Sequence, residues 1–250
     1  MRKIIMMSAA LLMVFAVLTA GGDSDLHKTW DTMLQKYVKN GQVNYKGFAR
    51  DVKQLDGYLE KLDKTDVSTF SREEKLAFWI NAYNAYTVKL ILNHYPVKSI
   101  RKISRPWKQR IWKAAGKTLS LDDMEHKILR KELKEPRIHF AIVCASIGCP
   151  DLQGFAFTGD HVNKQLDRAA TQFFASRKHF YFETDEKKVK IFISKIFSWF
   201  GEDFGDNKEQ KVNFILRFLE KPDAEKIKKA ASIKIKYLGY DWNLNEGRGK

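Results

Sequence analysis

Cysteine is nearly absent from this chain of 250 residues, and its two cysteines, Cys144 and Cys149, lie in one short stretch. A disulfide-dense secreted scaffold is therefore excluded, since such small domains carry several cysteine pairs. Proline is also scarce, and no proline- or serine-rich linker divides the sequence. We therefore expect one globular domain that is long enough to bury a sizeable core.

Several motifs that would identify a function are missing too. The chain has no zinc-finger spacing, arginine-rich arm or RNA-binding aromatic motif, so we expect no binding to nucleic acid. Ser146 lacks the flanking glycines of a nucleophile elbow. There is no internal repeat, and we predict no cofactor and no resident metal.

Acidic residues are outnumbered, with 30 Asp and Glu against 45 Lys and Arg and a formal net charge of +15. The lysines are spread along the whole length, which is typical of a solvated basic surface. A more specific interpretation is that the positive charge attracts the protein to anionic polymers or lipid head groups. We therefore predict an anionic cell-envelope component as a partner, and the oligomeric state stays open.

Long apolar runs are confined to the N-terminus. A short basic start, Met1–Lys3, precedes the run IIMMSAALLMVFAVLTA, which ends in small residues. This is typical of a secretory signal peptide, and the polar residues that follow lack the basic flank of a retained anchor. We predict a signal peptide over residues 1–22, cleaved near Ala20–Gly22, a domain over residues 23–245 and a basic tail over residues 246–250. The mature protein is then periplasmic or extracellular, with membrane contact only through the signal peptide before cleavage.

Helical and strand patterns are mixed along the chain. Apolar spacing predicts helices over residues 24–39, 71–94 and 121–133, and Ser71 and Glu74 form a capping box at the start of the second. HFYFET and VKIFIS predict a hairpin, and SIKIKYL a last strand. Without a regular βαβ rhythm, the pattern predicts an α+β fold with several amphipathic helices packed on a small, largely antiparallel sheet.

The stretch RIHFAIVCASIGCPDL, residues 137–152, holds both cysteines and His139. Its alternating apolar residues predict a strand that is buried on both faces and ends in a loop broken by Gly148 and Pro150. A buried strand that delivers reactive side chains into a tight loop is a common base for a site. We therefore look for function here first.

Two other groups of polar residues are candidates for a site. Glu125 falls in the apolar half of its predicted helix, and His126 lies at the border of that half. Glu125 must then meet a cation or hydrogen-bond donors, or carry a raised pKa. Asn81 and Asn84 lie three residues apart on the predicted central helix. A structural ion pair and the bracing of neighbouring loops are the alternative interpretations.

Four phrases recur in this order in a known family: KLAFWINAYNAYTVKLIL, SLDDMEHKILR, EPRIHFAIVCASIGCPDL and the terminal YLGYDWNLN. On these phrases the chain resembles the bacterial and plant domain-of-unknown-function family 547, from about Leu26 to Asn245. The resemblance implies a domain type and no reaction. The positions that it assigns to family motifs are Asn81, Glu125, His126, His139, Cys144 and Cys149.

The cysteine pair supports two main hypotheses of function. In an exported chain, the four-residue separation favours a Cys144–Cys149 disulfide in a binding or structural module. A redox-active form of the same pair is a variant of this hypothesis, although the spacing is not CxxC. The alternative is a thiol-dependent hydrolase or acyltransferase that acts on an envelope peptide or amide, with histidine before cysteine as in circularly permuted papain-like enzymes. Whether the chain is an enzyme stays open.

For the hydrolase, Pro150 predicts a short helix whose N-cap is Cys149. A helix N-terminus lowers the pKa of a thiol, which makes Cys149 the first choice of nucleophile and Cys144 the second.

A thiol nucleophile also needs a base, and the base needs an orienting partner. His126 is the predicted base, with Glu125 or Asn81 as its orienting partner, and His139 is the other candidate base. A metal site of both histidines and the cysteines is a third interpretation, but its H-x12-H-x4-C-x4-C spacing matches no standard zinc pattern.

Overall fold

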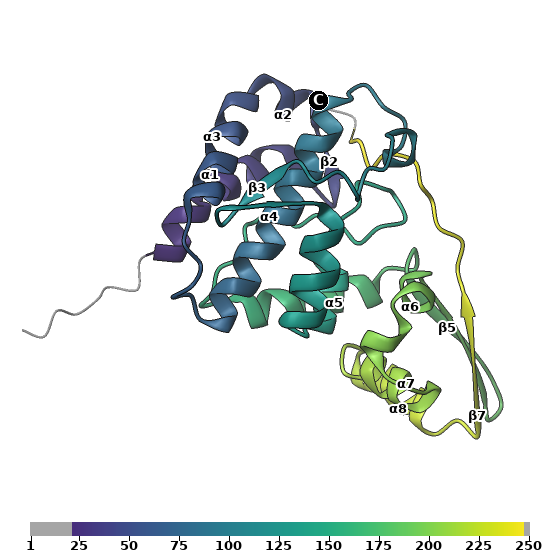
Figure 1. Ribbon diagram of the computed structural model, residues 1–250. Helices are drawn as coiled ribbons and strands as arrows, with labels where there is room; N and C mark the ends of the chain where they lie inside the picture. Colours follow the sequence, from purple (N-terminus) through teal and green to yellow (C-terminus); the bar gives the residue numbers. More distant parts are fainter. Residues whose placement is uncertain (1–21, 248–250) are drawn as a thin grey trace, which may run out of the picture.

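The computed structural model describes residues 22–247 (Figure 1). Helices and small, mostly antiparallel sheets alternate along the chain, which confirms the predicted α+β fold. The helices are α1 (Gly22–Tyr37), α2 (Tyr45–Arg50), α3 (Val52–Lys64), α4 (Arg72–Asn93), α5 (Val162–Ala175), α6 (Ile196–Trp199), α7 (Lys208–Leu216) and α8 (Lys221–Lys228), with the 3-10 or π segments η1 (Ile100–Lys102), η2 (Asp123–Glu132), η3 (Pro136–Phe140) and η4 (Gly201–Phe204). The strands are β1 (Val38–Lys39), β2 (Gln42–Val43), β3 (Trp112–Ala114), β4 (Lys117–Leu119), β5 (Phe180–Asp185), β6 (Lys188–Ile193) and β7 (Ser232–Tyr237).

Helix α4 is the centre of the larger hydrophobic core, as the sequence predicts. Its N-terminus carries the predicted capping box, in which the Glu74 backbone N–H donates to Ser71 Oγ at 3.1 Å and the Ser71 backbone N–H donates to Glu74 Oε2 at 2.7 Å. Every residue from Leu76 to Val88 is buried. Helices α1, α2, α3 and α5 and the segment η2 all contact it, so α4 is enclosed on every side.

A second, phenylalanine-rich core lies beneath β5, β6 and β7 and is covered by α7 and α8, at the lower right of Figure 1. Strands β5 and β6 form the predicted antiparallel hairpin, and β7 adds to β6 in parallel. Helix α5 belongs to both cores, because Leu166 packs in the first and Phe173 in the second. Phe140 of η3 also packs in the second core. The two cores are therefore continuous through α5 and the segment that precedes the cysteine loop.

The chain after β7 forms a C-terminal strap, residues 238–247, which returns across the molecule to β2 (Figure 1, yellow). On its way the strap pairs with the cysteine loop: the Ile147 N–H donates to Asn243 O at 2.9 Å, and the Gly148 N–H donates to Asp241 O at 2.8 Å. A side chain at position 148 would place its Cβ only 2.7 Å from the backbone nitrogen of Asp241, so this close approach requires glycine. The strap therefore fixes the cysteine loop from outside.

The predicted strand before the cysteine loop is wrong, because this segment is the 3-10 helix η3 followed by irregular chain. Pro136 is at the start of η3, and the Glu135 carboxylate accepts the Arg137 backbone N–H at 3.1 Å, which begins a helical turn. The following backbone bonds to Asn84 of α4 rather than to a neighbouring strand. The apolar alternation indicated burial correctly, but burial here does not come from a sheet.

Within residues 22–247, no helix is long and apolar enough to span a bilayer. The predicted signal peptide lies outside the described residues except for Gly22, which begins α1. The last three residues of the predicted basic tail also lie outside them.

Candidate functional site

A pocket of about 260 Å³ lies beside the cysteine loop and brings together five of the six predicted site residues. They come from two segments of the chain, η2 and the stretch that contains η3 and the loop. The five are Glu125, His126, His139, Cys144 and Cys149. Tyr83 of α4 and the aromatic residues of α6 and the C-terminal strap complete the wall.

Segment η2 supplies Glu125 and His126, and it is a π-helix rather than the predicted α-helix. Ser120 lies just before it, and its Oγ accepts the Asp123 backbone N–H at 3.0 Å. The five-residue bonding of the π form is visible at its end, where the Leu133 N–H donates to Ile128 O at 2.8 Å. Because a π turn is wider than an α turn, the rotation of about 100° per residue of an α-helix does not hold here. Such segments are frequent at functional sites.

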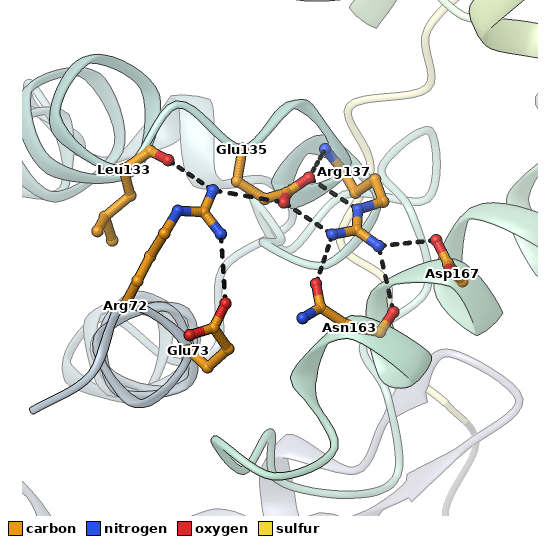
Figure 2. Close-up of polar contacts among 7 residues, drawn as sticks. All are labelled: Arg72, Glu73, Leu133, Glu135, Arg137, Asn163 and Asp167. Atoms are coloured by element: carbon orange, nitrogen blue, oxygen red, sulfur yellow. Dashed lines mark hydrogen bonds and ion pairs between the residues drawn. The ribbon is translucent and has the colours of Figure 1, made fainter.

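An ion-pair network holds the chain that leads into the pocket (Figure 2). Arg137 makes a bidentate pair with Glu135, both contacts at 2.8 Å, and reaches Asp167 of α5 at 2.8 Å. Arg72 of α4 lies 3.7 Å from the same Glu135 carboxylate and donates to Leu133 O at 2.8 Å. Glu135 is buried, so paired charges are necessary there. The network ties η3 to α4, α5 and the end of η2, which positions His139 and the cysteine loop.

The two cysteines lie side by side in the pocket wall. Their thiols are hydrogen-bonded with the sulfur atoms 3.1 Å apart, and the Cys144 backbone N–H donates to Cys149 Sγ at 2.9 Å. Tyr240 Oη of the strap lies 3.2 Å from Cys144 Sγ, and Ser146 Oγ lies 3.5 Å from it. The hydrogen bond from Cys149 and those from Tyr240 and Ser146 together lower the pKa of Cys144 to about 7, although burial acts in the opposite direction. Burial raises the pKa of the Cys149 thiol.

The predicted short helix after Cys149 is wrong. The chain beyond Pro150 runs without helix to Leu152, which pairs with Gly41 in an isolated bridge. Cys149 is therefore not a helix N-cap; its N–H bonds Ser146 O at 3.0 Å within the loop. The reason for preferring Cys149 as nucleophile is lost, because its pKa is raised rather than lowered.

Glu125 meets both expectations for a buried carboxylate. Its Oε2 accepts the Tyr83 hydroxyl at 2.9 Å, and burial raises its pKa to about 7 despite this bond. In about half of the molecules, the Glu125 carboxyl group is therefore protonated near neutral pH. Glu125 can accept or donate a proton in the pocket.

The two histidines are held by charged partners instead of by sulfur. His126 Nδ1 lies 3.0 Å from Arg130 Nη1 and accepts from it, because a guanidinium only donates. His139 Nε2 lies 2.6 Å from Asp203 Oδ2, and its ring stacks on Phe200 with centroids 4.3 Å apart. Burial lowers the pKa of both imidazoles. Within residues 22–247 no hydrogen bond joins either imidazole to a cysteine.

Asp203 of η4 is a site residue that the sequence interpretation missed. It accepts from His139 and, at 2.5 Å, from Arg130 Nε. Burial acts to raise its pKa, but the hydrogen bonds from these two side chains hold the pKa at about 2. The only local signal was its place in the aromatic phrase SWFGEDF, because His139 is far away in the sequence.

Asn81 does not line the pocket, and its predicted orienting role is wrong. Its Nδ2 donates to Phe157 O at 2.8 Å, and its Oδ1 accepts the Phe157 N–H at 3.0 Å. Asn84 acts in the same way, donating to Ala141 O at 2.9 Å and accepting the Val143 N–H at 2.9 Å. Both asparagines therefore brace loops, which is the structural alternative considered for them.

Metal ligands are not grouped in the part of the chain that the structure describes. Residues 22–247 contain no cluster of three or more His, Cys, Asp or Glu side chains that could hold a metal ion. The third interpretation of the histidines and cysteines has no geometric support there.

Comparison with known proteins finds a family whose description names no reaction. The family described as "Protein of unknown function, DUF547" matches residues 67–174, a shorter region than the resemblance seen in the sequence. The match includes all six predicted motif positions but not Asp203 or the C-terminal strap. No curated protein matches the chain, and no solved structure matches it. Residues 67–174 are therefore similar to the DUF547 family.

Proposed function

We propose that this protein is a binding domain whose Cys144 and Cys149 interchange between dithiol and disulfide through exchange with another molecule. The observation that carries the proposal is the pair of sulfur atoms, 3.1 Å apart in the wall of a pocket. A disulfide bond is about 2.05 Å long, so closing it requires a shift of roughly 1 Å.

The two thiols differ in the way that dithiol exchange requires. Cys144 is half-buried and has its pKa lowered to about 7, so it carries a substantial thiolate fraction at neutral pH. Cys149 is buried with a raised pKa, and it stabilises the Cys144 thiolate through its S–H. Cys144 is then the attacking sulfur and Cys149 the resolving one.

The exchange proceeds in two displacement steps. The Cys144 thiolate attacks one sulfur of a disulfide R–S–S–R′, the S–S bond breaks, and R′–S⁻ leaves and takes up a proton. Cys149 then loses its proton and attacks Cys144 Sγ, which forms the intramolecular disulfide and releases R–S⁻. The cysteine pair loses two electrons and two protons, and R–S–S–R′ gains them as two thiols.

Trapping with glutathione disulfide tests these roles. Cys149→Ser should accumulate a glutathione adduct on Cys144, because no resolving thiol is present. The wild-type protein should pass to the internal disulfide, which mass spectrometry identifies as the loss of two hydrogens. The control Cys144→Ser should react much more slowly at Cys149. A wild-type protein that keeps both thiols throughout a titration with glutathione disulfide contradicts the proposal.

A cysteine hydrolase or acyltransferase is a second candidate, favoured by His139, which lines the same pocket and lies 2.6 Å from Asp203 Oδ2. Asp203 would orient the imidazole, and Cys144 would carry the acyl group. Such an enzyme needs Cys144 and His139 but no resolving thiol. Release of product from an activated ester by Cys149→Ser, with loss of that activity in Cys144→Ser and His139→Ala, would favour hydrolysis over exchange.

We also propose that the protein is exported and meets an anionic component of the cell envelope. Exposed basic residues between positions 101 and 113, which flank Trp107 of the pocket, support the contact with an anionic component. An oxidising compartment would keep the cysteine pair mainly as the disulfide until a reductant reaches it.

A further inference from the structure

One wall of the pocket is a continuous aromatic surface built from segments far apart in the sequence. Trp107 lies after η1, Trp199 ends α6, and Tyr240 and Trp242 belong to the C-terminal strap. The ring centroids of Trp199 and Tyr240 are 4.8 Å apart, those of Tyr240 and Trp242 4.6 Å, and those of Trp107 and Trp242 6.1 Å. Trp199 is 44% exposed, so this wall reaches solvent. Such a surface suits a flat apolar group or a cation.

The charges that line this pocket are acidic, in contrast to the basic chain as a whole. Among the described residues, Asp122 and Glu125 line it and no lysine or arginine does. Arg101 and Arg130 stack on two rings of the lining, 5.2 Å from the Trp242 centroid and 5.0 Å from the Phe200 centroid. Arg130 is already paired with acidic side chains of η4.

Glu125 has an incomplete set of hydrogen bonds. The side chain is more than nine-tenths buried, and Oε2 accepts from Tyr83. Within residues 22–247, its other oxygen, Oε1, has no hydrogen bond from the protein, and the residue lines the pocket. An ionised carboxylate in a largely buried side chain is costly when a single hydroxyl group donates to it, so a bound group that donates a hydrogen bond and carries positive charge is favoured there.

We propose that this pocket binds a protonated primary amine on a small apolar body, with the ammonium group at Glu125 and the apolar body against the tryptophans. Three features support this ligand class: a carboxylate oxygen without a protein donor, an aromatic wall that attracts cations, and a lining that contains no lysine or arginine among the described residues. The volume of about 260 Å³ limits the ligand to a few tens of atoms or fewer. This binding uses the same pocket as the proposed thiol exchange but does not require the exchange.

Three probes that share one skeleton and differ in charge test the inference: 2-phenylethylammonium, 2-phenylethanol and phenylacetate. Titration calorimetry at pH 7 should give the cation at least tenfold tighter binding than the neutral alcohol, with the anion weakest. Equal affinity for cation and alcohol would mean a merely apolar pocket, and tighter binding of phenylacetate would mean that the basic surface dominates. Either result, or no binding of the cation, overturns the proposal.

Variants then locate the two ends of the ligand. Glu125→Gln should remove most of the preference for the cation while leaving the affinity for the alcohol unchanged, whereas Glu183→Gln on the exposed face of β5 should leave both unchanged. Trp199→Ala, at a partly exposed position, should weaken both probes. The Cys144→Ser/Cys149→Ser variant should still prefer the cation. If this double variant keeps the preference for the cation while glutathione trapping fails in the wild type, amine binding is supported and thiol exchange is not.

Discussion

At the residue scale, Cys144 illustrates how neighbouring donors set the reactivity of a half-buried sulfur. Its lowered pKa comes first from the Cys149 thiol and then from Tyr240 and Ser146. Each donor stabilises the thiolate more than the thiol, and burial alone would have done the reverse. The reactivity of Cys144 therefore depends on residues from both its own loop and the C-terminal strap.

Removing these donors should raise the pKa of Cys144. In Cys149→Ala, the pH at which Cys144 reacts with iodoacetamide at half its maximal rate should move upward from about 7 by about one unit or more. Tyr240→Phe should cause a smaller upward shift, because it removes a weaker donor. The alkylation rate as a function of pH measures both effects. An unchanged or lowered midpoint in Cys149→Ala would contradict the assigned role of that thiol.

Asp203 should stabilise the folded protein through its bonds to His139 and Arg130. Its pKa of about 2 in the folded protein is below the ordinary value, so its contribution is fully present above about pH 4 and is lost as the pH falls through about 2. Asp203→Asn should therefore reduce the free energy of unfolding by about 1–2 kcal/mol at pH 7 and flatten the acid side of the stability profile.

Glu202→Gln is the matched control for this change. Glu202 pairs with the same Arg130 at 2.7 Å, but its side chain is 80% exposed. An exposed pair contributes little, so this variant should lose no more than about 0.5 kcal/mol. Urea unfolding of both variants at pH 7 and at pH 3 measures the difference. Equal losses in the two variants would mean that burial does not strengthen the Asp203 contacts.

At the element scale, what could be predicted from the sequence depended on whether the stabilising contacts were local. The capping box and apolar stripe of α4 and the β5–β6 hairpin were predicted correctly, because their signals lie within a few residues of one another. The strand predicted before Cys144 was wrong, since the backbone of that segment bonds to Asn84 rather than to a strand. The π form of η2 has no local signal that distinguishes it from an α-helix.

In the candidate site, too, the residues with a local sequence signal were predicted, and those placed only by tertiary folding were missed. Glu125, His126, His139 and the cysteines were identified from motifs, and the structure brings them to one pocket. Asp203 and the aromatic wall were missed, because only tertiary folding places η4 beside His139, and α6 and the C-terminal strap at the pocket.

Asn84 should link α4 to the cysteine loop energetically. Asn84→Ala leaves the Ala141 carbonyl and the Val143 N–H without their partner in a buried region, which should cost about 2–4 kcal/mol of unfolding free energy. Asn81→Ala is the matched control, since it removes the equivalent two bonds to Phe157 and should cost a similar amount. Only Asn84→Ala should also change the alkylation rate of Cys144. A similar change in both variants would mean that general loosening, and not the loop contact, controls the thiol.

At the scale of the whole molecule, two opposite electrostatic features coexist. The chain carries an excess of basic residues, while the pocket lining is acidic and aromatic. Long-range attraction would thus bring the protein to an anionic surface, and the pocket would select a different, cationic group at short range. The C-terminal strap forms part of the pocket wall and then crosses back to β2.

Binding to an anionic polymer should therefore be strongly salt-dependent and should not involve the pocket. Retention on a dextran sulfate column should fall steeply between about 0.05 and 0.5 M salt, because the screening length shortens from more than 10 Å to a few Å. Lys102→Gln/Lys108→Gln removes two exposed charges next to Trp107 and should elute at lower salt than the wild type. Lys226→Gln/Lys228→Gln removes the same charge from α8, where the lysines pair with Asp223 and Glu225, and should shift elution less. Equal shifts would indicate attraction by net charge alone, and retention that ignores salt would exclude an electrostatic interaction with the polymer.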